Sequence, residues 1–317
     1  MNLLIPSQEM LLKAALLQGE SSLAAWREWV VLTDWEHTHI DPGSYALLPL
    51  IYSNLTCGVS DEGKLQGEAS RMPAGGEEDG KGKKIGVENK SLALDRLRGI
   101  YRHTWAANET GFRSVGGALK LLADAGIPTL LPDGAALALR FYGSHACRPV
   151  RSQTVWVRAD RALEAARRLR KAGWQSVTRL PASLAAVRNT VRRAWPLRDE
   201  IGHVLFLRGR SWSDRERAIW AASRPIQVGA GHGLALNPTE QFLYLSARAS
   251  RARSGLALPF LADAAQLLRS SGAAMDWSCI QHQATARALI RQVSMISEEL
   301  KEISLKGRVK KSGEPVN

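Results

Sequence analysis

Residues 126–174 read GIPTLLPDGAALALRFYGSHACRPVRSQTVWVRADRALEAARRLRKAGW, and this stretch decides the fold of the chain. Its apolar runs and helical spacing predict a strand, a helix, a strand and a helix in that order, over residues 127–131, 135–142, 154–157 and 160–171. Asp133 and Gly134 are typical of the turn that follows the first strand. These elements indicate a core of both helices and strands, and we expect the functional site to lie within it.

The composition is that of a basic, globular protein. The chain has 317 residues, enough for one large domain or two modest ones, and 45% of them are apolar, which allows a sizeable buried core. The formal net charge is +13. Such an excess of positive charge is consistent with a solvated basic face or with an anionic partner, such as a nucleotide, a nucleic acid or an acidic peptide.

Three features of the sequence indicate where in the cell the protein is located. Cys57, Cys147 and Cys279 are widely separated and form no paired framework, which favours a reducing cytoplasm. The first residues lack the basic and small-residue features of a signal peptide. No apolar run reaches the ~20 residues that a membrane-spanning helix needs. We therefore expect a cytoplasmic protein with no membrane partner.

Changes in composition divide the chain into five segments. Residues 58–90 are rich in Gly, Glu and Lys and nearly free of large apolar side chains, so burial cannot offset the entropy cost of ordering them. The predicted organisation is an N-terminal helical segment (1–57), a flexible insertion (58–90), an α/β core (91–230), a C-terminal helical region (231–305) and a disordered tail (306–317).

Several further elements are expected outside the central stretch. Asp41-Pro42 is typical of the start of a helix, which Pro49 should kink. A long helix is predicted over 92–125, with a break at one of its glycines. A β-hairpin is predicted over 190–207, and a last helix from about 276 to 303.

Short motifs along the chain resemble those of a known family. Gly126-Ile127-Pro128, Gly134-Ala135-Ala136-Leu137, Arg148-Pro149 and Gly173-Trp174 stand in the order in which that family has them, and the run from Leu261 to Leu268 extends the match. The chain resembles the uncharacterised nucleotidyltransferases of bacteria, within the polymerase-β-like superfamily. This resemblance implies an α+β fold, with a small mixed sheet of the polymerase-β-like type flanked by an N-terminal helical segment and a C-terminal helical bundle.

The sequence differs from the family pattern at the positions that carry the family's catalytic residues. The two aspartates of its D-x-D motif would stand at Ser152 and Thr154, its lysine at Asp133 and a third acidic residue at Leu205. Carboxylates on alternate residues of a strand point to the same face, where they hold the Mg²⁺ that nucleotidyl transfer requires. Neutral hydroxyls are weak ligands for that ion. We therefore expect the fold to be kept, the transfer chemistry to be lost, and no metal or cofactor to be bound.

Basic residues remain around the expected cleft. Gly134, Arg148, Arg151 and Arg158 border the strand that would carry the lost aspartates, and they are the candidate ligand-binding residues. Guanidinium groups bind phosphates and carboxylates directly, so such a cleft could hold a nucleotide or another anion without a metal. A solvated basic surface explains the same residues equally well.

Three functions fit these features. The preferred one is a binding or scaffold partner of a protein or peptide, in a peptide-modifying natural-product pathway. The second is an active nucleotidyltransferase that uses Mg²⁺ and an NTP to move an NMP group to a peptide or small molecule, with carboxylates recruited from Asp133, Asp199 or Glu200. The third is a basic nucleic-acid-binding module, which ranks last because Trp156 is the one aromatic side chain interleaved with the basic ones.

Overall fold

The computed structural model describes residues 5–33, 40–57, 81–178, 194–252, 257–294 and Lys301. Its first part consists of four helices: α1 (Pro6–Leu16), α2 (Gly19–Leu32), α3 (Pro42–Tyr45) and α4 (Leu48–Cys57). The predicted helix start at Asp41 is confirmed, because its carboxylate accepts hydrogen bonds from the backbone N–H groups of Gly43 and Ser44. The predicted kink at Pro49 is instead a boundary between two helices, since Pro49 is the second residue of α4.

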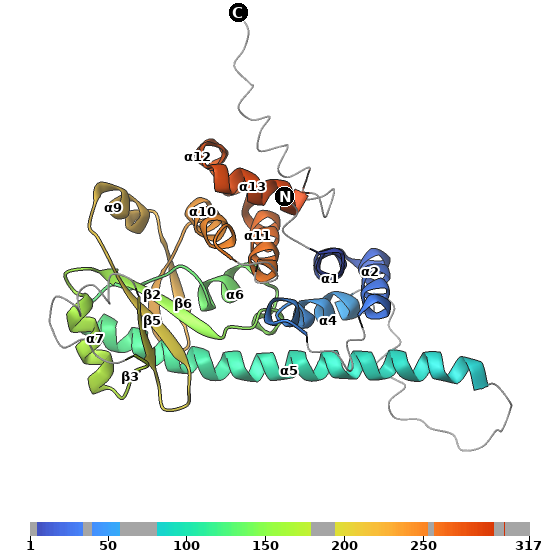
Figure 1. Ribbon diagram of the computed structural model, residues 1–317. Coiled ribbons are helices and arrows are strands. Elements are labelled where there is room, and N and C mark those ends of the chain that lie inside the picture. Colours follow the sequence, from blue (N-terminus) through green and yellow to red (C-terminus); the bar gives the residue numbers. More distant parts are fainter. Residues whose placement is uncertain are drawn as a thin grey trace, which may run out of the picture.

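A single long helix, α5 (Lys81–Asp124), connects the N-terminal helices to the sheet (Figure 1). The predicted break at a glycine is absent. Gly116 instead allows close approach, because a side chain there would collide with the backbone of Val228. The helix also begins at Lys81, inside the segment predicted to be flexible, where lysine and glutamate are good helix formers. Residues 58–80 lie outside the described part of the chain.

Among the residues that the structure describes, a mixed sheet of seven strands forms the centre of the α/β core, in the order β3-β4-β5-β2-β1-β7-β6. The strands are β1 (Leu130–Leu131), β2 (Ser152–Arg158), β3 (Gln175–Ser176), β4 (Trp195–Arg198), β5 (Val204–Arg210), β6 (Arg224–Val228) and β7 (Gly231–Ala235). Strands β2 and β5 are parallel neighbours at the centre. The predicted hairpin over 190–207 is confirmed for β4 and β5, which are antiparallel, while its residues 190–193 lie outside the described part of the chain.

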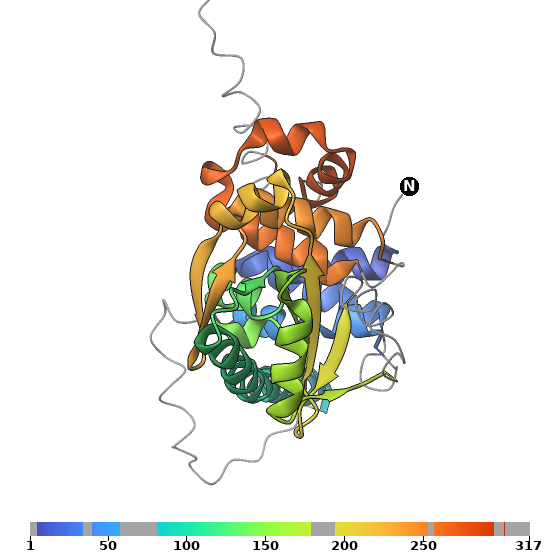
Figure 2. The same cartoon turned by 90° about the vertical axis from the view of Figure 1, so that its left-hand side faces the viewer.

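The two faces of the sheet are covered by different helices. One face packs on α5 and α7 (Ala162–Lys171) around a core that includes Val155, Val157 and Leu207. The opposite face carries Trp156 and packs on α9 (Asp214–Ala221) and α10 (Pro238–Ala249). Figure 2 shows α5 and α7 in the lower part of the molecule and the C-terminal helices above.

The C-terminal helices pack on the N-terminal ones in a second large core. They comprise α10, α11 (Leu258–Ser271), α12 (Trp277–His282) and α13 (Ala284–Ser294), and α6 (Ala135–Phe141) joins them to the sheet. The single last helix predicted over 276–303 is wrong, since the backbone of Gln283 is extended and separates α12 from α13. The α+β fold with helical flanks is confirmed. Among the residues described, no helix has both the length and the apolar character to cross a membrane.

Candidate functional site

Strand β2 presents two chemically different faces. Val155 and Val157 are fully buried beneath α5 and α7. Because side chains alternate along a strand, Ser152, Thr154, Trp156 and Arg158 point to the opposite face, which we call the site face. The two positions at which the family resemblance implies aspartates therefore lie on one face of one strand, as the D-x-D spacing requires.

The register of β5 assigns its residues to the same two faces. Thr154 is paired with Phe206, and Trp156 with Arg208. Leu205 is paired with Gln153 and is completely buried in the core on the far side of the sheet. Leu205 was expected at the third acidic position, but a residue there does not face Thr154, because one step along a strand reverses the side chain. Phe206 is the residue of β5 that faces the same way as Thr154.

The carboxylate of Asp133 is held against Thr154. Its Oδ1 accepts the backbone N–H of Thr154 at 2.9 Å, and its Oδ2 accepts the Thr154 hydroxyl at 2.8 Å. Tyr244, from α10, donates its hydroxyl to the same Oδ2 at 2.8 Å. Burial, and then the charge of Asp133, raise the pKa of Tyr244, so this tyrosine remains a donor. The carboxylate of Asp133 thus accepts three hydrogen bonds, two from Thr154 and one from Tyr244.

Gly134 has a role in the turn itself. Its φ of +60° lies in the region that glycine adopts most easily, and a side chain there would collide with that of Gln153. Gln153 in turn accepts the N–H of Ala135 at 2.7 Å and donates to the carbonyl of Asp133 at 3.0 Å. This buried glutamine fixes the turn that aims Asp133 at the site face.

Arg148 was expected to contact a ligand, and the structure places it in an internal ion pair. Its guanidinium binds Asp263 of α11 in a bidentate manner, at 2.6 and 2.8 Å. The side chains of Arg148 and Asp263 are 15% and 1% exposed. Burial alone would lower the pKa of Arg148, but the charge and hydrogen bonds of Asp263, together with Tyr142 and Asp133, outweigh it and raise that pKa. Tyr142 also donates to Asp263, at 2.7 Å, so the cluster joins the sheet to the C-terminal helices.

The remaining two arginine candidates lie apart from Arg148. Arg151 is exposed just before β2. Arg158, at the other end of β2, binds Asp160 at 2.6 Å and lies 4.7 Å from the centre of the Trp212 ring. The structure therefore does not bring the predicted basic residues together into one cleft.

The two other carboxylates considered for metal binding do not join Asp133. Asp199 accepts hydrogen bonds from Ser114 of α5 and from the backbone of His203, so it belongs to the α5 side of the sheet. Burial alone would raise the pKa of Asp199, but the hydrogen bonds from Ser114 and His203 outweigh it and lower that pKa. Glu200 is exposed in the β4–β5 turn. Within the described ranges, no three His, Cys, Asp or Glu side chains are grouped to hold a metal.

Sequence reasoning missed a basic and aromatic cluster on the site face. The guanidinium of Arg210 lies 4.4 Å from the centre of the Trp156 ring and forms an ion pair with Glu216 of α9. Arg208 lies beside them, and its pKa is lowered by burial and by the charge of Arg210. The alternation in LRGR, residues 207–210, was the available signal, because it puts two arginines on the face of Thr154.

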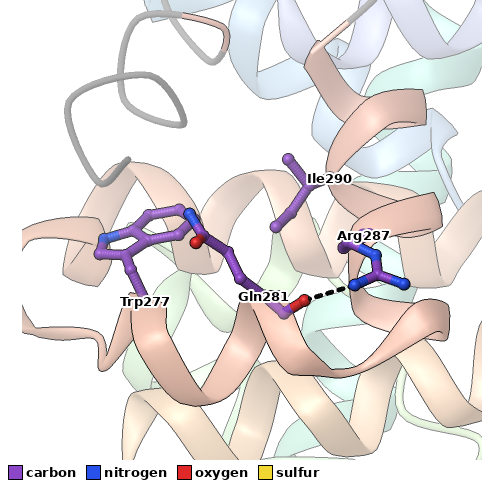
Figure 3. A pocket seen from close by; sticks show the side chains of 4 residues that line it. All are labelled: Trp277, Gln281, Arg287 and Ile290. Atoms are coloured by element: carbon purple, nitrogen blue, oxygen red, sulfur yellow. Dashed lines mark hydrogen bonds between the residues drawn. The ribbon is translucent and has the colours of Figure 1, made fainter. Parts of the chain in front are cut away.

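A hollow of about 370 Å³ opens elsewhere, between α12 and α13 (Figure 3). It is lined by Trp277, Gln281, Arg287 and Ile290, and Arg287 donates to the carbonyl of Gln281 at 2.8 Å. None of these residues belongs to the sheet. The hollow is therefore lined by other residues than those of the site face.

Replacing Tyr244 by Phe is expected to lower the free energy of unfolding by about 1.5 kcal/mol, because a hydrogen bond to a charged carboxylate is lost. Urea denaturation followed by circular dichroism measures this change. Tyr45→Phe is the matched control, since the Tyr45 hydroxyl has no hydrogen bond to a described residue. Equal stability of the two variants would show that Tyr244 does not hold Asp133.

Comparison with known proteins gives a family match over most of the chain. A family model described as an uncharacterised nucleotidyltransferase matches residues 83–298, most of the chain. Among solved structures, an antigenic nucleotidyltransferase-like protein from Paracoccidioides brasiliensis is similar, with 11% identity and a TM-score of 0.42, over 63% of this chain and 93% of that one. No curated protein matches the sequence.

Proposed function

The chain belongs to the uncharacterised nucleotidyltransferase family, and we propose that it keeps the family's fold but has lost Mg²⁺-dependent nucleotidyl transfer. One observation carries the proposal. On the site face, the positions of the two expected aspartates are the hydroxyl residues Ser152 and Thr154, and the nearby carboxylate of Asp133 accepts hydrogen bonds from Thr154 and Tyr244.

The electrostatics of the site face support the same conclusion. Mg²⁺ is bound in such sites through carboxylates and phosphates in near-ideal octahedral geometry. Here β5 contributes Phe206, Arg208 and Arg210 to the face of Thr154. Positive side chains therefore lie beside the position that Mg²⁺ would occupy. These positive side chains repel a divalent cation. The nearby carboxylate of Asp133 already accepts three hydrogen bonds and does not offset that repulsion.

We propose that the protein acts instead as a cytoplasmic binding or scaffold partner of a protein or peptide, within a peptide-modifying pathway. The alternative of an active enzyme requires several carboxylates at one metal. Asp133 and Asp199 bond to helices on opposite faces of the sheet, which argues against their sharing an ion. The alternative of a nucleic-acid-binding module rests on net charge alone.

Calorimetric titration with each NTP, with and without Mg²⁺, tests the loss of metal-dependent chemistry. We expect the dissociation constant of any NTP that binds to change less than about twofold on addition of Mg²⁺, because no carboxylate set recruits the ion. Titration of Mg²⁺–NTP into buffer corrects for the heat of dilution. Binding that tightens by about tenfold or more with Mg²⁺, or NMP transfer to any acceptor, would overturn the proposal.

A further inference from the structure

Buried polar atoms without partners gather on the site face. Across the described residues, eight buried side-chain polar atoms have no hydrogen-bond partner, and five of these belong to one neighbourhood. They are Nε1 of Trp156, Nε of Arg208, Nε of Arg210, Oε2 of Glu216 and Nε1 of Trp220. Because a buried polar atom without a partner costs about 1–3 kcal/mol, such a concentration indicates that something polar completes the site.

The contacts among these residues make them one site between the sheet and α9. Arg208 is paired with Trp156 across β2 and β5, and Arg210 stacks on the Trp156 ring. Trp156 and Trp220 belong to the same apolar cluster and are 6% and 7% exposed. Glu216, on α9, forms an ion pair with Arg210. We call Trp156, Arg208, Arg210 and Trp220 the donor cluster.

The donor cluster is rich in donors and in positive charge. Four of the five unpartnered atoms are N–H donors, and one is an acceptor. The acceptor belongs to Glu216, which lies beside the donor cluster and whose Oε1 already accepts a hydrogen bond from Arg210. Arg208 has no ion pair with a described residue, and its neighbours include two further cations, Arg210 and Arg251, besides Glu216 and Tyr244. An acceptor-rich, negatively charged group satisfies this arrangement.

We propose that the donor cluster binds a phosphate group directly, without a metal ion. The donors come from β2, β5 and α9, and so from several directions, which suits a tetrahedral oxyanion better than a planar carboxylate. Trp156 is two residues beyond Thr154, about 7 Å along the strand, so the phosphate site lies beside the former D-x-D position and does not coincide with it. The inference rests on the proposed function, because arginines, and not Mg²⁺, neutralise the negative charge of the phosphate.

Calorimetric titration of the full chain with pyrophosphate in EDTA tests this site. We expect pyrophosphate to bind the native chain, and Arg208→Gln to weaken that binding by at least about tenfold, since a charged donor is removed. Arg208→Lys keeps the charge without the planar fork and should give an intermediate loss. The matched control is Arg167→Gln on α7, an exposed arginine on the other face of the sheet, which should change the affinity less than about twofold.

The outcomes separate this inference from the proposed function. A folded native chain that binds no pyrophosphate with or without Mg²⁺ would overturn the phosphate site alone. Binding that appears only with Mg²⁺ would overturn both. Acetate or glutamate binding as tightly as pyrophosphate would overturn the choice of phosphate, and equal losses in Arg208→Gln and Arg167→Gln would overturn the location. Circular dichroism confirms the folding of each variant.

Discussion

Replacing Asp263 by Asn is expected to lower the free energy of unfolding by about 3–5 kcal/mol, because it leaves a buried guanidinium without its counter-charge. Asp263 is 1% exposed and accepts two hydrogen bonds from Arg148 and one from Tyr142. An asparagine side chain has about the same size but carries no charge. It also turns an NH₂ donor towards groups that are themselves donors, so the loss combines charge and hydrogen bonding.

Urea denaturation, followed by circular dichroism, measures the change against a matched exposed pair. Asp124→Asn makes the same chemical substitution in the Lys120–Asp124 pair, whose side chains are 58% and 61% exposed. We expect that control to cost less than about 1 kcal/mol. A double variant with Arg148→Met and Asp263→Leu should recover part of the stability, because it removes both buried charges together. Equal costs for Asp263→Asn and Asp124→Asn would contradict the role of this pair.

Local patterns predicted the elements but not the contacts between them. The strand over 154–157 and the helix that ends at Lys171 followed from apolar spacing, which reflects which face an element buries. The Arg148–Asp263 pair spans 115 residues of sequence. No local pattern shows which distant carboxylate a basic residue will meet, so Arg148 was a plausible ligand-binding residue until α11 was placed against it.

The face of β5 is the clearest case of missing information. Residues 204–207 read VLFL, and a wholly apolar run has no alternation to show which side chains point to the core. The register with β2 resolves this, because it places Leu205 behind the sheet and Phe206 beside Thr154. The same register moves Arg208 and Arg210 to the site face. The positive charge of the chain was therefore visible from sequence, whereas its concentration beside the D-x-D position was not.

Restoring the two aspartates, as Ser152→Asp with Thr154→Asp, is expected to create Mg²⁺ affinity. Both residues lie on the site face, and Asp133 already contacts residue 154, so the double variant brings three carboxylates together. Without Mg²⁺ these charges repel one another, and we expect the variant to be less stable than the native chain. With Mg²⁺ at about one hundred times its dissociation constant, the free energy of unfolding should rise by about 2.7 kcal/mol, because only the folded chain assembles the ligands.

Thermal and urea denaturation with increasing Mg²⁺ measure this response, and the native chain should show none. The variant with Ser152→Asn and Thr154→Asn is the matched control, since asparagine has the size of aspartate but lacks the charge that the ion requires. A response limited to the aspartate variant would mean that β2 still has the geometry of a metal-binding strand and that the loss lies in two side chains. If the folded aspartate variant shows no change in stability with Mg²⁺, then the arginines of β5 or the hydrogen bonds at Asp133 prevent the ion from binding. Adding Arg208→Gln to that variant separates these causes, because it removes a cation of β5 that has no ion pair with a described residue, while leaving Asp133 and Tyr244 in place.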